Sequence, residues 1–85
     1  MEILYRRDAV KALRRMQRAK AEDINAAIRL IAADPWAANN NIRPLRGVPN
    51  GFRVRIGDWR VSYTLDRSGE VLEVFEIAPR GGAYR

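Results

Sequence analysis

The chain has 85 residues, of which 47% are hydrophobic, and its formal net charge at pH 7 is +6. This length allows one small domain, residues 1–85, with a thin core, and the hydrophobic content argues against disorder. Cysteine and histidine are both absent, which excludes disulfides, thiolate metal sites and the usual general base. We therefore expect no metal, no cofactor and a cytoplasmic location. No apolar run approaches the ~18 residues of a membrane span, so no membrane partner is expected.

The positive charge is carried almost entirely by arginine, which supplies fourteen of the sixteen cationic side chains. The planar guanidinium group binds phosphate and carboxylate through two parallel hydrogen bonds, which lysine cannot do. The composition therefore favours a nucleic acid or an acidic protein as partner over a surface that is merely solvated.

The first half of the chain predicts a short strand followed by two helices. Residues 1–5 are suited to an edge strand, and Asp8 is suited to cap the first helix. Polar residues at 17–20 separate two sets of apolar residues at helical spacing, which are Ala9, Val10, Leu13 and Met16, and then Ile24, Ala27, Ile28 and Ile31. Pro35 should end the second helix, and the Pro- and Asn-rich residues 34–50 predict a long connecting loop.

The second half predicts three antiparallel strands at about 51–57, 59–66 and 70–77. Gly57-Asp58 suits a two-residue hairpin turn with glycine first. The predicted fold is therefore α+β, with an N-terminal strand and a two-helix hairpin packed on one face of a small antiparallel sheet. The register of the last strand stays open, because both of its faces are mostly apolar.

The predicted hairpin at residues 51–63 separates apolar from cationic side chains. One face carries Phe52, Val54, Ile56, Trp59, Val61 and Tyr63. The other face carries Arg53, Arg55 and Arg60, and the turn places Arg55 directly opposite Arg60. Like charges opposite one another destabilise a strand pair, so this face predicts an anionic ligand.

Four features in order give the chain a resemblance to a known family: the helical hairpin, Leu45-Arg46-Gly47, GFRVRIGDWRVSY and the terminal PRGGAYR. Over its whole length the sequence resembles the RelE/ParE superfamily of toxins from bacterial type II toxin–antitoxin systems, and within it the RelE-like branch. This resemblance implies a RelE-like fold and an mRNA interferase, an endoribonuclease that cuts translated mRNA in the ribosomal A site and so inhibits translation.

The resemblance also implies the site residues. Basic residues on the central strands of the family match Arg53, Arg55 and Arg60. An arginine after the last strand matches Arg80, and a C-terminal tyrosine matches Tyr84. The implied catalytic residues are thus Arg55, Arg60, Arg80 and Tyr84. The implied RNA-binding residues are Arg53 and Arg46, the latter matching a loop arginine near the substrate.

The residue types restrict the chemistry that these positions can perform. Arginine stays protonated in proteins, so it can bind a phosphate and stabilise developing charge but cannot act as a general base. Cleavage can then use the 2′-OH of the substrate as nucleophile. Tyr84 either stacks on a base or deprotonates the 2′-OH, for which its pKa of about 10 must be lowered by nearby cations.

The resemblance implies a cognate antitoxin protein as partner, with operator DNA bound through that antitoxin, besides mRNA and the ribosome. Two alternatives stay open. One is a ParE-like inhibitor of DNA gyrase that cuts no RNA, and the other is a non-catalytic relative that binds nucleic acid.

Overall fold

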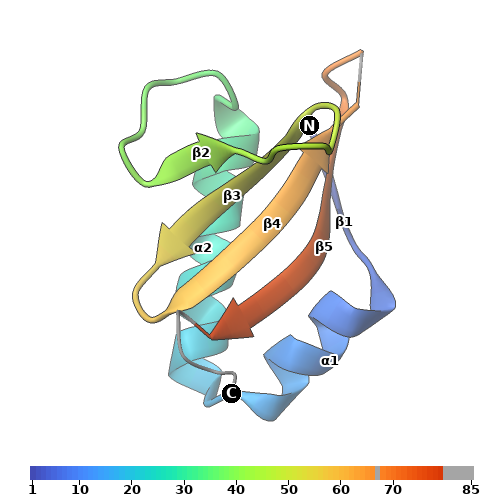
Figure 1. Cartoon of the computed structure of the whole chain (residues 1–85). Helices are drawn as coiled ribbons and strands as arrows, with labels where there is room; N and C mark the ends of the chain where they lie inside the picture. The colour runs from blue at the N-terminus through green and yellow to red at the C-terminus, as the bar shows by residue number, and fades with distance from the viewer. Residues whose placement is uncertain (67, 80–85) are drawn as a thin grey trace.

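A single sheet with two helices on one side forms the fold in the computed structural model, which describes residues 1–66 and 68–79 (Figure 1). The five strands lie in the order β1-β5-β4-β3-β2. In chain order the elements are β1 (Glu2–Tyr5), α1 (Arg7–Arg15), α2 (Arg18–Ala33), β2 (Ile42–Pro44), β3 (Gly51–Ile56), β4 (Trp59–Leu65) and β5 (Val71–Pro79). The α+β fold predicted from the sequence is confirmed.

The two predicted helices are separated at Met16 and Gln17, whose ψ angles of 166° and 145° are not helical. The predicted cap at Asp8 is wrong, because Arg6 precedes the helix and Asp8 lies within its first turn. The reason is that the Arg6 N–H donates to the Val74 carbonyl at 2.9 Å, which holds Arg6 in the sheet until the helix begins. Neither helix of the described part is long and apolar enough to cross a membrane.

The sheet is mixed, whereas the sequence predicted an antiparallel one. The β2–β3, β3–β4 and β4–β5 pairs are antiparallel, but β1 lies parallel to β5. The sequence prediction rested on hairpin turns, which fix the relative direction of consecutive strands only. Because β1 and β5 are not consecutive, no turn determines whether they pair parallel or antiparallel. Strand β2 was also missed, because its three residues lie within the segment predicted as loop and end in proline.

A β-bulge settles the register of the last strand. Tyr63 pairs with Val74 and Ser62 with Glu76, so Phe75 is the extra residue in β5. Before the bulge Leu72 and Val74 point into the core, and after it Ile77 does. The face with Leu72 and Val74 is therefore buried in the first half of β5, and the face with Ile77 is buried in the second half.

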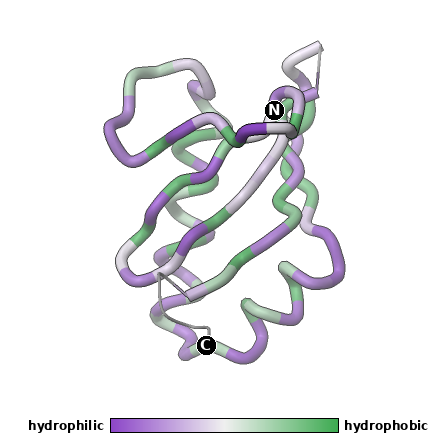
Figure 2. Tube along the Cα trace, in the orientation of Figure 1, coloured by the Kyte–Doolittle hydropathy of each residue, from purple (hydrophilic) through white to green (hydrophobic). Residues whose placement is uncertain are grey.

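The core lies between the helices and one face of the sheet. Its largest fully buried apolar side chains are those of Tyr63, Ile24, Ile28, Leu72, Val61 and Val74. The ring of Phe52 stacks on Tyr63 with a centroid distance of 5.7 Å. Figure 2 shows hydrophilic and hydrophobic residues alternating along β3, as a strand buried on one face requires. The second face of the sheet is thus left for polar side chains.

Candidate functional site

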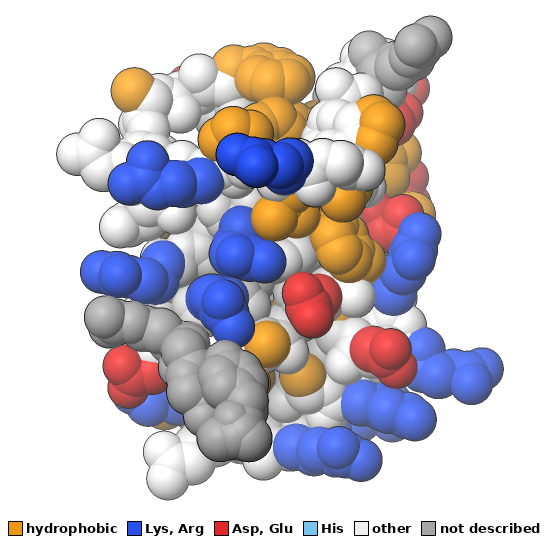
Figure 3. All heavy atoms as spheres, in the orientation of Figure 1, with side chains coloured by type: hydrophobic (Ala, Val, Ile, Leu, Met, Phe, Trp, Pro, Cys, Tyr) orange, Lys and Arg blue, Asp and Glu red, His pale blue; other side chains and the backbone are white. Residues whose placement is uncertain are grey.

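Four arginines share the sheet face that points away from the helices. Arg43 comes from β2, Arg53 and Arg55 from β3, and Arg60 from β4. We call this set the arginine face. Strand alternation puts these side chains there, since their neighbours Ile42, Val54 and Val61 belong to the core side. Figure 3 shows Lys and Arg side chains gathered over these three strands.

The strand register arranges the four arginines as two pairs. Arg55 lies opposite Arg60, as predicted, and Arg43 lies opposite Arg53. Directly opposite Cα atoms in an antiparallel ladder are about 4.5–5.5 Å apart. The two pairs are two residues apart along β3, which corresponds to about 6.8 Å. The cations are therefore concentrated within a few ångströms in both directions of the sheet.

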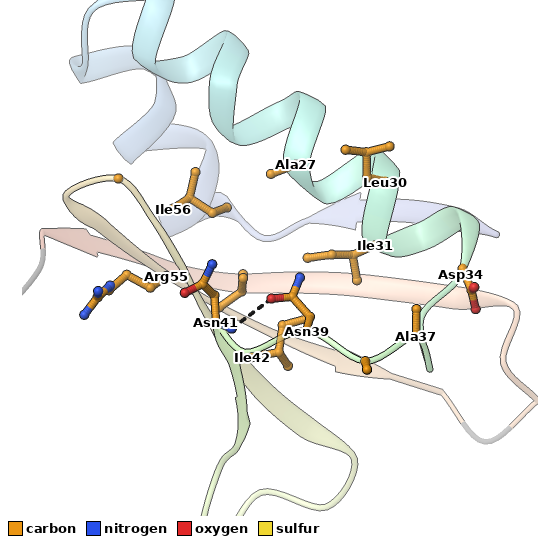
Figure 4. Close-up of a pocket in the computed structure, with 13 residues that line it drawn as sticks. Ala27, Leu30, Ile31, Asp34, Ala37, Asn39, Asn41, Ile42, Arg55 and Ile56 are labelled. Atoms are coloured by element: carbon orange, nitrogen blue, oxygen red, sulfur yellow. Dashed lines mark hydrogen bonds between the residues drawn. The ribbon is translucent and has the colours of Figure 1, made fainter.

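A pocket of about 330 Å³ opens on the arginine face, and all four arginines line it. Its remaining wall consists of Asn40, Asn41, Pro44 and Leu45. The Asn41 carbonyl accepts the Arg55 N–H at 3.0 Å, and the Asn41 N–H donates to Asn39 Oδ1 at 2.8 Å. Figure 4, a close-up of the neighbouring pocket on the helix side, shows Asn41 beside Arg55 and the hydrogen bond between Asn41 and Asn39. The segment before β2 is thereby fixed against the edge of β3, and its residues Asn40 and Asn41 line the pocket of the arginine face.

Acidic groups on the described part of the sheet leave most of this charge in place. Glu73 of β5 forms an ion pair with Arg6, which is not one of the four arginines, at 3.2 Å. Glu76 is exposed and accepts a long hydrogen bond, 3.5 Å, from the Ser62 hydroxyl. Within residues 1–66 and 68–79, no ion pair joins Arg43, Arg53 or Arg55 to a carboxylate. The face therefore presents a concentrated positive potential to an anion.

The structure brings together some of the predicted site residues and not others. Arg53, Arg55 and Arg60 lie in one pocket. Arg46 is exposed on the turn between β2 and β3, and it does not line that pocket. Arg80 and Tyr84 lie outside the described residues. The last described residue, Pro79, pairs with Trp59.

Arg43 is the site residue that the sequence reasoning missed. It lies in the segment predicted as loop, so no facing could be assigned to it. The signal available was the alternation of apolar Ile42 with Arg43, which places Ile42 against the core and Arg43 on the opposite face. Only Ile42 and Arg43 alternate before Pro44, and two residues are too few to predict a strand.

The described tyrosines are unsuited to act as a base at neutral pH. Burial raises the pKa of Tyr63 to about 12, and its ring lies in the core. Burial also raises the pKa of Tyr5, whose hydroxyl donates to Asn25 Oδ1 at 2.8 Å. No group of three or more acidic side chains placed to hold a metal occurs in residues 1–66 and 68–79. The described site can bind a phosphate and stabilise negative charge on it.

A second pocket, of about 400 Å³, lies on the helix side of the sheet. Figure 4 shows Ala27, Leu30 and Ile31 of α2 above it, with Ile56 pointing toward the helix and Arg55 pointing away from it. Leu30 is 76% exposed at its rim. This pocket is mostly apolar and lies on the helix side of the sheet, and it meets the pocket of the arginine face at Asn41 and Arg55, which line both.

Comparisons with known proteins agree with this architecture. The family model described as "ParE toxin of type II toxin-antitoxin system, parDE" matches residues 3–84. No curated protein sequence gives a match.

Among solved structures, the chain is similar to the archaeal RelE–RelB complex from Pyrococcus horikoshii OT3, with a TM-score of 0.81 and 24% identity over 96% of this chain and 97% of that one. It is also similar to the YoeB/ParE toxin from Agrobacterium tumefaciens, with a TM-score of 0.78 and 24% identity over 94% and 99% of the two chains. The isolated E. coli RelE toxin gives a TM-score of 0.78 at 16% identity, over 98% of this chain and 87% of that chain. At these identities the structural likeness concerns the fold.

Proposed function

Because this chain belongs to the ParE toxin family of type II toxin–antitoxin systems, in the RelE/ParE superfamily, we propose that it is an mRNA endoribonuclease acting at the ribosomal A site. The observation that carries this proposal is the pocket on the sheet face into which four arginines converge. Such a face suits a polyanion whose reacting group is a phosphate. Because it lies on the side of the sheet opposite the core, a strand of RNA can reach it.

In the proposed reaction the substrate supplies its own nucleophile. The 2′ oxygen attacks the adjacent phosphorus, the bond from phosphorus to the 5′ oxygen breaks, and the products are a 2′,3′-cyclic phosphate and a free 5′-OH. Arg55 and Arg60 bind the non-bridging oxygens of the scissile phosphate and stabilise the charge that grows on them. Their permanent positive charge suits this role and excludes them from removing the 2′-OH proton.

The proton steps are assigned to the C-terminal segment. Tyr84 is proposed to take the proton of the 2′-OH, a role for which nearby arginines must lower its pKa from the usual value of about 10, and the departing 5′ oxygen takes up a proton from solvent. Arg80 stabilises the leaving group, and Arg46 and Arg53 bind flanking phosphates. The ribosome contributes by holding the mRNA in a reactive geometry, since positioning is a large part of the catalytic effect.

The test is to induce the protein in growing cells and map mRNA ends by primer extension. We expect translation arrest with new 5′ ends inside reading frames, and loss of these ends in Arg55→Gln, Arg60→Gln and Arg80→Ala. Tyr84→Phe separates the two roles of the tyrosine, because it keeps the ring for stacking but loses the hydroxyl. Arg14→Gln, an exposed position on α1, is the matched control and should cleave normally. Undiminished cleavage by Arg80→Ala and Tyr84→Phe would refute their assignment.

The proposed partner in the uninduced cell is a cognate antitoxin, which also links this chain to operator DNA. Several similar structures are complexes of a RelE toxin with a RelB antitoxin, which supports such a partner. If a gene next to this one encodes an acidic protein, co-expression of that protein should restore growth, and the protein should co-purify with the toxin. Growth arrest that persists with every neighbouring gene product would contradict it.

Inhibition of DNA gyrase is the second candidate, and the description of the matching family as ParE toxins favours it. This activity would cut no RNA and would induce DNA-damage signalling. The same induction experiment separates the two functions: new mRNA ends without a DNA-damage response support the endoribonuclease, and the reverse result supports the gyrase inhibitor.

A further inference from the structure

We infer that Arg43 and Arg53 form a second phosphate site, so that the arginine face takes two consecutive phosphates of one single-stranded RNA. The proposal rests on the proposed function and deepens it: it assigns a role to Arg43 and sets a minimum length for the substrate. Arg55 and Arg60 hold one phosphate, and the neighbouring pair holds the next.

The strand register sets the spacing of the two pairs. Arg43 and Arg53 are directly opposite, and so are Arg55 and Arg60, so each pair can direct two guanidinium groups at one phosphate. The midpoints of the two pairs are offset by two residues along β3, about 6.8 Å, and by one strand spacing across the sheet, about 4.8 Å, which places them about 8 Å apart. Because the guanidinium groups lie at the ends of long side chains, the two pairs can reach successive phosphates of one extended backbone.

Both pairs of arginines open into the same pocket. Its volume of about 330 Å³ lies between the arginines and the segment of Asn40, Asn41, Pro44 and Leu45. Pro44 and Leu45 supply apolar surface for the face of a base, and the two asparagine amides supply donors and acceptors for its edge. A base can reach this wall only if it is unpaired and unstacked, which selects single-stranded RNA.

Arg43 is held in place by the sheet, and its side chain is accessible. The short strand β2 is bound to β3 through its pairing, and the Leu45 N–H donates to the Gly51 carbonyl at 2.9 Å just beyond it. The Arg43 side chain is exposed, and no carboxylate in residues 1–66 and 68–79 is paired with it. Its charge is therefore positioned by the sheet and available to a ligand.

The test compares two oligonucleotides, a dinucleotide with one phosphate and a trinucleotide with two, both 2′-O-methylated to prevent cleavage. Binding to the intact protein is followed by NMR titration. The wild type should bind the trinucleotide about fivefold more tightly or better, as expected for one additional charge-assisted contact. Arg43→Gln should remove this advantage and leave dinucleotide binding unchanged, whereas Arg55→Gln should weaken both.

A salt series adds a readout that a purely structural role of Arg43 would not move. For a longer unstructured RNA, the slope of log K against log salt should decrease in magnitude by about 0.7 in Arg43→Gln, because one phosphate contact is lost. Arg14→Gln on α1 is the control and should leave the slope unchanged, and thermal unfolding verifies that each variant is folded.

The outcomes separate the two proposals. The second phosphate site is overturned if the wild type binds both oligonucleotides equally well. It is also overturned if the trinucleotide affinity and the salt slope are unchanged in Arg43→Gln. Neither result contradicts mRNA cleavage. Absence of mRNA cleavage together with undetectable binding of either oligonucleotide overturns both. Lost trinucleotide preference in Arg43→Gln with cleavage retained in the wild type supports both.

Discussion

Replacing Arg55 by glutamine should stabilise the fold while it weakens phosphate binding. Arg55 lies opposite Arg60 and two residues along β3 from Arg53, so it has two cationic neighbours on the same face. Its own side chain is exposed, and glutamine therefore removes the charge with little loss of packing. The free energy of unfolding should rise because these two repulsions disappear.

The size of the effect follows from the spacing on the sheet. In water, unit charges repel each other by about 0.75 kcal/mol at the roughly 5.5 Å spacing of Arg55 and Arg60 and by about 0.6 kcal/mol at the roughly 6.8 Å spacing of Arg55 and Arg53, which gives about 1.4 kcal/mol without salt. Screening with a Debye length of about 10 Å at 0.1 M salt halves this to about 0.7 kcal/mol, and at 1 M about 0.2 kcal/mol is left. For a domain of this size, about 0.7 kcal/mol corresponds to a rise in Tm of about 4 °C.

The assay is urea and thermal unfolding of the wild type, Arg55→Gln and Arg55→Lys at 0.02, 0.1 and 1 M NaCl, on the order of the ionic strengths at which screening changes most. Arg55→Lys keeps the charge and should match the wild type. The stability gain of Arg55→Gln should shrink as salt increases. A gain that is independent of salt, or a loss of stability at low salt, would refute the repulsion argument.

Three further predictions concern the fold. Hydrogen bonds to the Asp66 carboxylate, first from the Ser68 hydroxyl and then from the Val71 N–H, hold the Asp66 pKa below its usual value. This carboxylate therefore stabilises the fold above its unfolded pKa of about 3.9, and the contribution disappears as pH falls through the folded pKa. Urea midpoints of Asp66→Asn should lie below those of the wild type at pH 7 and approach them as the pH is lowered below the folded pKa, and a difference that does not change with pH would contradict this. Leu72, which is fully buried, should cost about 2–5 kcal/mol when replaced by alanine, and a urea midpoint equal to that of the wild type would show that the site is not tightly packed. Gly57 has φ +58° and open space at its Cβ position, so Gly57→Ala should cost about 1–2 kcal/mol through backbone strain alone, and Gly57→Asn should cost less in the same assay.

The sequence by itself determined the elements with a clear period and the hairpin with a clear turn. The spacing of apolar residues in α1 and α2 needs burial on one side only, and Pro35 stops the second helix whatever surrounds it. Gly57-Asp58 fixes the pairing of β3 with β4, and that register puts Arg55 opposite Arg60. These properties are local, because they are set by residues within a few positions of one another, and they can therefore be predicted without knowledge of the tertiary structure.

Only the tertiary structure decided the features that depend on distant parts of the chain. The parallel pairing of β1 with β5, the bulge at Phe75 and the strand at Ile42–Pro44 all arise from contacts between segments far apart in sequence. Arg43 joined the candidate site for the same reason. The three residues of β2 are too few to show a strand pattern. Arg43 lies on the same face as the other arginines because its neighbour Ile42 packs against the core and β2 pairs with β3.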